Sequence, residues 1–559
     1  MSMRFRVESK SVAIALAVAV LLLFGIFPIV LLVINSFIVD GHFSLGNFRE
    51  VYANKSNLTA VWNTIKASGL TMLFGTVLSF PLAWLVGRTD LPFKTVFRTL
   101  IITPYMVPPF VGAIAWGYLA NPRIGYLNQW IRALIPGIEQ GPLNIYTMGG
   151  MIWVLVLFYF PFSFLSISRA LEKMDPSLEE AARISGAGPM RVLKDITIPL
   201  TAPAIAAGAL LVFVAVASAF GIPSLIGGQA RIQVVTTRII SYVYVGTPEA
   251  MHEATALAVV LLILSVIALW FSNWYLAKRE YFTLGGKSTR PTMVELGRWK
   301  WPMVVLFAIA CFVFAILPVM ALVMTSLVKT MGRGFAFDNL TLDVWRSVLK
   351  DKVTWRTLRT SLFSSVLAAT GGTVVGLLIA YLKVKTRVRF RTIPDFLATF
   401  CNATPGIVLA LGLIIAFSGK YGLNLYGTFW MLVVAYFVRH LSYAVRQAAA
   451  ALEQVHPSLE EAALSSGAGW GRVFRDVTIP LIGPSLVGGW FLVFMPSFYE
   501  LTMSVLLYSS KATPVGYHLY HLSSFASPQS AAVLSVLILI LVLIGNLLMR
   551  WASRGKVSL

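Results

Sequence analysis

The residues whose types and spacing best suit a chemical task form a short acidic and alanine-rich motif that occurs twice. In each copy a glutamate is followed by two alanines and, four residues later, by a glycine. The carboxylate can accept charge-assisted hydrogen bonds from an arginine of a partner, and the small alanines allow a close contact. These residue types suit the binding of a partner protein. The residues are Glu180, Ala181, Ala182 and Gly186 in the first copy and Glu461, Ala462, Ala463 and Gly467 in the second.

The two copies belong to a longer internal repeat. Residues 170–203 and 451–484 align at a constant shift of 281 with 22 identities in 34 positions. Unrelated segments of similar composition would share roughly 3, so the repeat is real. It is also the most polar stretch in each half of a mainly apolar chain. A polar segment kept in both halves indicates a binding surface.

Local sequence predicts a helix–turn–helix around each copy of the motif. Ser177 and Ser458 each begin a Ser-x-x-Glu capping box directly after a proline. Gly186 and Gly467 are placed to end the first helix in the left-handed conformation. A second short helix then leads into the next apolar run. We expect a short, rigid element that exposes its glutamate and alanines.

Two further groups could contact a solute. Glu500, preceded by Tyr499, lies near the expected outer end of an apolar run, where a carboxylate is costly unless it faces a cavity or a partner. A path lined by it would favour a cation, although a carboxylate at the water interface or paired within the protein is an equally good interpretation. His518 and His521 are three residues apart and could contact a metal, but as interfacial residues they need no such role.

Several enzyme signatures fail at a required position. Gly286-Lys287-Ser288 approaches a phosphate loop, but Tyr281 stands where its first glycine must be. His252-Glu253 begins a zinc-protease pattern, but Ala256 occupies the position of the second histidine. We therefore expect no catalysis, no ATP hydrolysis and no bound cofactor in this chain.

The elements that must position these residues are membrane-spanning helices. Of the 559 residues, 57% are hydrophobic and only 12% are charged, about half the charged fraction of a soluble domain. Apolar runs of about 20 residues recur, each long enough to cross a bilayer as a helix. The expected spans are 11–37, 58–86, 97–119, 147–167, 198–220 and 254–276, then 301–328, 358–382, 393–417, 426–438 or somewhat beyond, 481–501 and 531–549.

Loop charge gives the expected orientation. The net charge of +22 is better explained by basic cytoplasmic loops than by nucleic-acid binding. Basic residues follow the second span of each half and fill the linker 278–300, which places both chain ends and both motifs in the cytoplasm. The halves then have the same topology, which is a parallel repeat. We expect a first repeat at 1–290 with its polar segment at 175–198, a second at 291–559 with its polar segment at 456–479, and an extra external segment near 121–141.

The doubled motif resembles the signature of permease subunits of bacterial binding-protein-dependent ABC importers. That signature reads Glu-Ala-Ala, three residues, Gly, nine residues and Ile-x-Leu-Pro. Here Ile198 and Ile479 stand in for its leucine, and Val477 for its first isoleucine. Two copies in one chain are similar in layout to the fused permeases of ferric-iron importers.

The resemblance implies an all-α polytopic protein of the type I importer class. It would have about twelve transmembrane helices in two parallel six-helix repeats, each with a cytoplasmic coupling helix, in the bacterial inner membrane. The implied partners are two ABC ATPase subunits, which would carry ATP and magnesium, a periplasmic solute-binding protein and membrane lipids, with no nucleic acid. Ferric iron is the first choice of substrate; thiamine, polyamines, phosphonates and sugar phosphates stay open.

Two other classes compete with this interpretation. A secondary transporter of twelve spans would also have parallel halves, but it usually needs charged groups or ion ligands within its spans, which are nearly absent here. A channel or membrane scaffold would leave the repeated motif unexplained, and no ring of pore-lining charges is recognisable. Both alternatives are therefore weaker than a permease.

Overall fold

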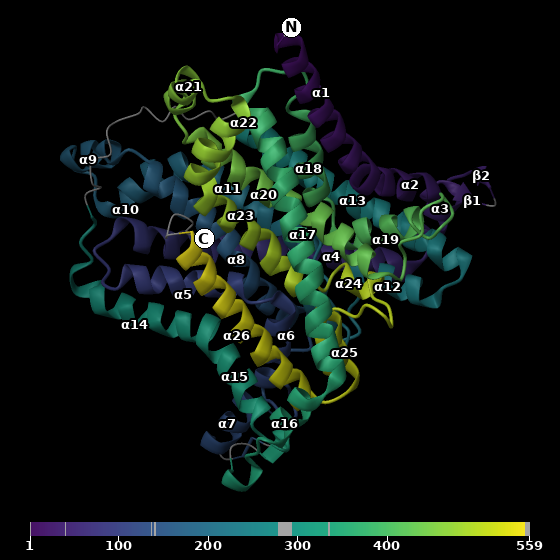
Figure 1. The fold of residues 1–559 in the computed structure, drawn as a ribbon. Coiled ribbons are helices and arrows are strands. Elements are labelled where there is room, and N and C mark those ends of the chain that lie inside the picture. Colours follow the sequence, from purple (N-terminus) through teal and green to yellow (C-terminus); the bar gives the residue numbers. More distant parts are fainter. Residues whose placement is uncertain are drawn as a thin grey trace.

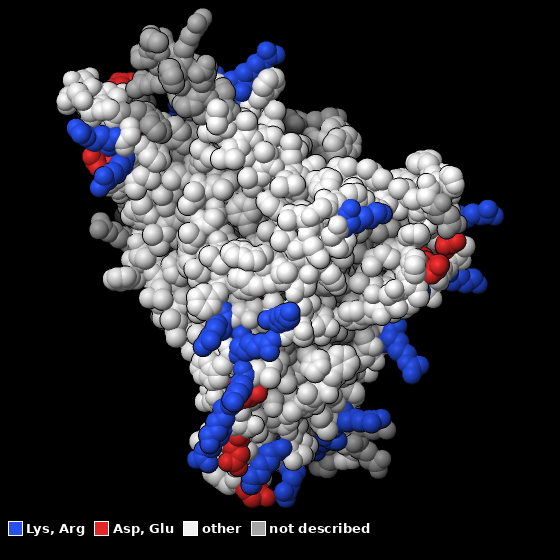
Figure 2. Space-filling view, turned by 45° about the vertical axis from the view of Figure 1, so that its right-hand side comes forward, with Lys and Arg blue, Asp and Glu red and all other residues white. Residues whose placement is uncertain are grey.

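The computed structural model describes residues 2–39, 41–135, 137–138, 141–277, 293–333 and 336–553. Within them the chain is helical (Figure 1) apart from one short hairpin of β1 (Ile38–Val39) and β2 (His42–Phe43) and a few isolated bridges. Figure 2 shows a broad area without charged side chains between two charged ends, as expected for a surface that faces lipid.

The helices of the two halves follow one another in matching order. The first half contains α1 (Ser2–Leu21), η1 (Leu22–Ile26), α2 (Phe27–Ser36), α3 (Gly46–Ala53), α4 (Lys55–Arg88), α5 (Lys94–Met106), α6 (Pro109–Ala120), α7 (Tyr126–Leu134), α8 (Met148–Lys173), α9 (Pro176–Ile184), α10 (Pro189–Val192), η2 (Leu193–Thr197), α11 (Ile198–Ala217), η3 (Pro223–Gly227), α12 (Val235–Val245) and α13 (Pro248–Ala277). The second contains η4 (Gly297–Trp299), α14 (Lys300–Cys311), η5 (Phe312–Ile316), α15 (Leu317–Ser326), η6 (Met331–Arg333), η7 (Phe337–Asn339), α16 (Asp343–Lys350), α17 (Lys352–Lys385), α18 (Ile393–Ala403), α19 (Gly406–Ala416), α20 (Phe429–Glu453), α21 (Pro457–Ser465), α22 (Trp470–Val473), η8 (Phe474–Thr478), α23 (Ile479–Phe498), α24 (Ser504–Leu507), α25 (Val515–Phe525) and α26 (Pro528–Ala552).

Each of the twelve predicted spans coincides with a helix or a helix pair. In the described part of the chain, nine helices are long and apolar enough to cross a membrane, and up to eleven spans result if each of two bent pairs counts as one. The helix at the predicted tenth span, α20, is not among them, and it carries Arg439, His440 and Arg446. The prediction of an all-α polytopic fold is confirmed.

Two of the predicted spans are not single helices. The third and ninth spans break into α5 and α6, which meet at 99°, and into α18 and α19, which meet at 107°. Both breaks fall just before a proline: Val107 and Thr404 have extended backbone and precede Pro108 and Pro405. The proline ring excludes its predecessor from the helical region, so the bend is fixed locally.

The first span of each half packs on the other half. In the second half, α19 approaches α2 so closely that a Cβ on Gly412 would lie 2.7 Å from the Pro28 oxygen. Conversely, α14 packs on α5 of the first half, where the rings of Phe97 and Phe307 meet edge to face at 5.3 Å. The two repeats of the sequence are thus not two separate bodies.

The end of the linker, residues 294–300, contacts the first half beside the end of α4. The Val294 N–H donates to the Arg88 oxygen at 2.9 Å, and the Leu296 N–H donates to Asp90 Oδ1 at 2.9 Å. Lys300 Nζ lies 3.0 Å from Asp90 Oδ2. The N–H of Leu296 and then Lys300 hold the pKa of Asp90 below its usual value. The boundary predicted between residues 290 and 291, like the phosphate-loop fragment 286–288, lies outside the described residues.

Candidate functional site

The two predicted helix–turn–helix segments exist and lie at one end of the molecule, away from α7 and α16 (Figure 1). We call α9 and α21 the hook helices. Their predicted capping boxes are wrong, because Pro176 and Pro457 take the first helical positions and the residues before them become the N-caps. Asp175 accepts a hydrogen bond from the Ser177 N–H at 2.9 Å, which lowers the pKa of this carboxyl. In the second copy His456 takes the same position.

The predicted glycine ends of the hook helices are confirmed. Gly186 has φ +84° and Gly467 has φ +85°. After Gly186, the Ala187 N–H donates to the Ala182 oxygen at 3.0 Å, and the Gly186 N–H donates to the Arg183 oxygen at 2.9 Å. This pair of bonds satisfies carbonyls that a helix end otherwise leaves open. The second copy makes the corresponding two bonds, at 3.1 and 3.0 Å.

A buried polar cluster ties the first hook helix to its own half. Glu179, one residue before the motif glutamate, accepts a hydrogen bond from Thr197 Oγ1 at 2.7 Å and lies 3.8 Å from Arg88 Nη1. Arg88 also donates to the backbone oxygens of Leu171 and Met174. The side chains of Arg88 and Glu179 are 2% and 4% exposed. The hook helix is therefore joined to α4, to the end of α8 and to η2, which leads into α11.

The second half builds the same cluster with a lysine. Glu460 accepts a hydrogen bond from Thr478 Oγ1 at 3.0 Å and lies 3.4 Å from Lys385 Nζ. Lys385 also donates to the Val455 oxygen at 3.0 Å. Neither cluster was predicted from the sequence, although the signal was present. The Glu-Glu doublet and the threonine repeat at the same shift, and a basic residue ends the second span of each half.

The outer face of each hook presents small and apolar residues. Ala181, Glu461 and Ala462 are exposed, whereas Glu180 is half-buried. Next to the first copy, Ile184 is 88% exposed. Leu178 and Met190, close to it in the sequence, are exposed as well, and several exposed apolar side chains in one short segment are typical of a surface that a partner covers. At the position of Ile184 the second copy has Ser465, so the two hooks offer related but different surfaces.

Glu500 is bonded within the protein. Its carboxylate accepts hydrogen bonds from the Met503 N–H at 2.9 Å, from the Ser504 N–H at 3.0 Å and from Ser504 Oγ at 3.0 Å. The carboxylate thus satisfies the open N–H groups at the start of α24. Of the two interpretations left open by the sequence, the geometry matches pairing within the protein.

Tyr499, the neighbour of Glu500, lines a cavity of about 230 Å³ between the halves. One wall comes from α5, α6 and α8 and the other from α20, α23 and α26. The lining is mostly apolar, rich in aromatic rings and without a charged side chain. It consists of Tyr105, Met106, Pro109, Phe158, Tyr159, Phe162, Tyr443, Phe491, Leu492, Met495, Pro496, Tyr499, Val542, Asn546 and Met549.

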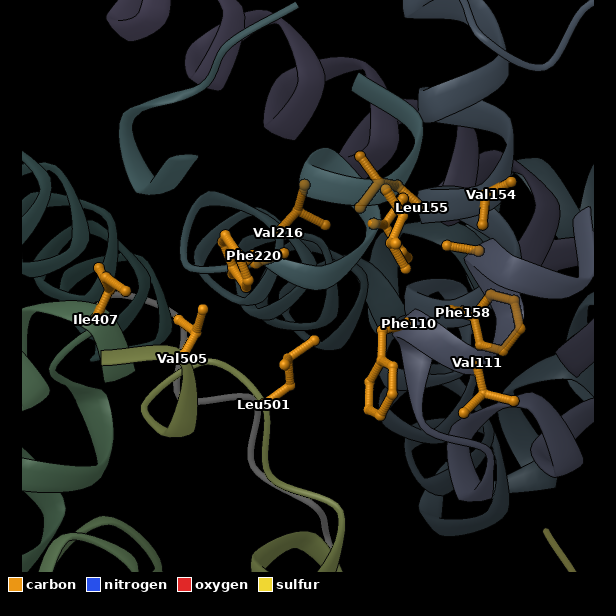
Figure 3. Close-up of a cluster of buried hydrophobic side chains, with 14 of the residues drawn as sticks. Phe110, Val111, Val154, Leu155, Phe158, Val216, Phe220, Ile407, Leu501 and Val505 are labelled. Carbon is orange, nitrogen blue, oxygen red and sulfur yellow. The ribbon is translucent and has the colours of Figure 1, made fainter. Parts of the chain in front are cut away.

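An apolar contact between the halves adjoins this cavity. In Figure 3, Phe110 and Phe220 of the first half converge with Leu501 and Val505 of the second, and all four are buried. Gly221 packs here too, since a Cβ on it would lie 2.5 Å from Phe110 Cβ and 3.3 Å from Leu501. We call this contact the plug. Because Glu500 holds α24 in place, it also fixes the backbone that carries Leu501 and Val505.

His518 and His521 lie on α25 at the end away from the hooks. Among the described residues there is no group of three or more His, Cys, Asp or Glu side chains that could hold a metal ion. Asp351 interacts electrostatically with His518 but is already engaged as the N-cap of α17, accepting from Val353 and Thr354. The two histidines therefore gain no further ligand in the described part of the chain.

Comparison with known protein families shows to which family the chain belongs. The family of binding-protein-dependent transport system inner membrane components matches residues 75–280 and again residues 372–557. The chain belongs to this family and contains its domain twice. The protein is thus a multi-pass transport permease, as the resemblance of its doubled motif implied.

Individual relatives share about a quarter to a third of their residues with this chain over the aligned regions. The chain is similar to the ferric transport system permease protein FbpB of Actinobacillus pleuropneumoniae, with 26% identity over 83% of this chain and 66% of the relative, just under two thirds of its length. It is similar to a probable ABC transporter permease protein of Sinorhizobium fredii, with 26% identity over 87% of this chain and 85% of the relative. The molybdenum transport system permease protein ModB of Escherichia coli is 31% identical over 38% of this chain and 91% of its own length.

Proposed function

We propose that this chain forms the transmembrane path of an ATP-driven importer and that the hook helices are the docking points of two separate ATPase subunits. The observation that carries the proposal is the pair of polar clusters around Glu179, which is buried, and around Glu460, which is partly buried. Each joins a hook to the second and fifth spans of its half. A displacement of the hook by a partner must then move those spans with it, because the interior is close-packed.

The same proposal gives the other components. The hooks and both chain ends face the cytoplasm of a bacterium, and the chain lies in the inner membrane. A periplasmic solute-binding protein delivers the solute to the opposite end, where α7 and α16 lie. ATP and magnesium are bound by the ATPase partners, and this chain holds no cofactor of its own.

Ferric iron is the substrate that we propose. The support is that relatives matching most of this chain carry ferric transport in their names. Relatives named for molybdenum and for sn-glycerol-3-phosphate match shorter parts. The alternative is the same machinery acting on thiamine, a polyamine, a phosphonate or a sugar phosphate. A secondary transporter has no ATPase subunits, so the two hook helices would have no function in it.

A double charge reversal at the motif glutamates tests the coupling role. We expect Glu180→Lys with Glu461→Lys, co-expressed with the ATPase and reconstituted with the binding protein, to lose uptake while the spans stay folded in a thermal melt. Glu249→Lys, at an exposed glutamate at the start of α13, is the matched control and should transport normally. Normal uptake by the double variant, or failure of any ATPase to co-purify with the unaltered chain, would overturn the proposal.

A further inference from the structure

The first turns of α17 carry three exposed basic residues, Lys352, Arg356 and Arg359. They are four and three residues apart, so their side chains lie on one face of the helix. The Arg356 guanidinium donates a hydrogen bond to the backbone oxygen of Ser510, which brings the neighbouring Lys511, also exposed, to the same end of α17. We call these four basic residues the outer basic patch.

The charge of the outer basic patch is not balanced within the described part of the chain. None of its four residues forms an ion pair with a carboxylate there. The carboxylate next to it in the sequence, Asp351, is engaged as the N-cap of α17, where it accepts from the N–H groups of Val353 and Thr354. Like charges three and four residues apart on a helix repel each other and are destabilising. An anion from outside the chain would relieve this repulsion.

The same face of α17 continues as an apolar surface. Phe363, Leu367 and Val374 follow Arg359 at intervals of four, four and seven residues, and all three are exposed. Because α17 is long and apolar enough to cross a membrane, we expect this stripe to face the acyl chains. The exposed Trp355 marks the level of the headgroups, where tryptophans are enriched. Figure 2 shows Lys and Arg side chains gathered along the border of the area without charge.

The first half lacks this arrangement. The repeated Trp-x-Thr pattern aligns Trp62 of α4 with Trp355 of α17, so the three basic positions of α17 correspond to Thr59, Asn63 and Lys66. Only the last of these is basic. Basic residues are normally concentrated on the cytoplasmic side of a membrane protein, whereas the proposed orientation places this end of α17 outside. A basic face placed against that trend, in one half alone, indicates a specific partner.

We propose that the outer basic patch binds the phosphate of an anionic phospholipid in the outer leaflet, with the acyl chains of the lipid along the apolar face of α17. Guanidinium groups match the geometry of phosphate, and basic side chains beside a span attract anionic headgroups. The partner is a lipid because the basic and apolar residues form one continuous face. The inference goes beyond the proposed function and takes only the orientation from it. The bound lipid would tie α17 to the loop that carries Lys511.

A lipid titration tests the site. The purified chain in a neutral detergent is titrated with phosphatidylglycerol or with phosphatidylcholine of the same acyl chains, and bound lipid is counted by native mass spectrometry. We expect phosphatidylglycerol to bind about tenfold more tightly, and added salt to reduce the difference. Lys352→Gln with Arg359→Gln should abolish the preference. This double variant keeps Arg356 and its bond to Ser510, so its thermal melt should match that of the unaltered chain. Lys66→Gln in α4 is the matched control and should keep the preference.

Several outcomes would overturn the lipid site. They are equal binding of the two lipids by the unaltered chain, an equal loss of preference in Lys66→Gln, or complete displacement of the lipid by inorganic phosphate, which would indicate a site for a free anion. A double variant that keeps its lipid preference but no longer binds a solute-binding protein would show that the patch contacts an acidic protein instead. The titration needs no ATPase, so the proposed permease function fails separately, through loss of hook-dependent coupling.

Discussion

At the residue scale, each hook helix carries two adjacent glutamates in different surroundings. The first of each pair, Glu179 or Glu460, turns inward to a threonine and a basic residue of its own half. The second is the motif glutamate. Consecutive residues on a helix point about 100° apart, so the first glutamate can turn inward while the second is more accessible: Glu180 is half-buried and Glu461 is exposed. The repeated motif of the sequence drew attention to the second glutamate of each pair. The inward position of the first glutamate could not be predicted, because burial is seen only in the structure.

Removal of the inward glutamate should affect the two halves unequally. Glu179→Ala leaves Arg88 buried and without its carboxylate, which typically costs about 3–5 kcal/mol. Glu460→Ala should cost clearly less, since the side chains of Lys385 and Glu460 are 11% and 20% exposed and the lysine can reach water. Thermal melts of the two variants in the same detergent measure the difference. Equal losses of stability in the two variants would show that the deeper burial of the first cluster does not increase the cost of losing its glutamate.

The glycine at the end of each hook helix offers a backbone test. Gly186→Ala should cost about 1 kcal/mol, because a side chain is disfavoured at φ +84°. A Cβ there would meet nothing within 4 Å, so the loss is conformational. Gly188→Ala is the matched control, since Gly188 is equally open but has φ −69°. Amide hydrogen exchange of α9 should quicken in the first variant alone; equal exchange in both would contradict the prediction.

At the element scale, prolines decide where the spans deviate from straight helices. Four one-turn π-helices, η1, η2, η5 and η8, each precede a helix with proline at its second position: Pro28, Pro199, Pro318 and Pro480. A proline clashes with the carbonyl four residues earlier, and the wider turn relieves that clash. The order and approximate limits of the spans followed from apolar length alone. The π-turns and the two sharp bends did not, because a proline in an apolar run is compatible with a kink, a wide turn or a break.

Close helix contact makes a sharp prediction within α17. A Cβ on Gly376 would lie 2.8 Å from the Ala444 Cβ and 3.0 Å from the Val445 backbone nitrogen, whereas a Cβ on Gly372 would make ordinary contact with Val493 at 3.6 Å. Gly376→Ala should therefore force α17 away from α20 and destabilise the protein by about 1–3 kcal/mol. Gly372→Ala, one turn earlier on the same helix, should be nearly neutral. The two melting temperatures decide the point, and a larger loss at Gly372 would show that α20 is not the tighter neighbour.

At the scale of the whole molecule, the parts that pack together differ from the repeats of the sequence. The span formed by α1, η1 and α2 packs on α17, α18 and α19 of the second half, and α14 and α15 pack on α5 and α6 of the first. An internal repeat indicates that two similar units exist. It does not show that the first span of each unit packs on the other unit. That exchange depends on contacts between residues several hundred positions apart, which a single sequence does not display.

A disulfide across the exchanged contact tests whether α1, η1 and α2 move with the second half. A Cβ on Gly25 would lie 3.9 Å from the Cβ of Cys401 in α18, close to the usual spacing of about 3.8 Å in a disulfide. We expect Gly25→Cys to bond to Cys401 on oxidation, so that free thiols counted in the denatured variant fall from three to one, Cys311. The same variant with Cys401→Ser should keep its thiols. If both segments belong to one rigid body, ATP-driven uptake by the oxidised protein should match that of the reduced protein. Arrest on oxidation with recovery on reduction would show instead that the first span slides over the broken helix during each cycle.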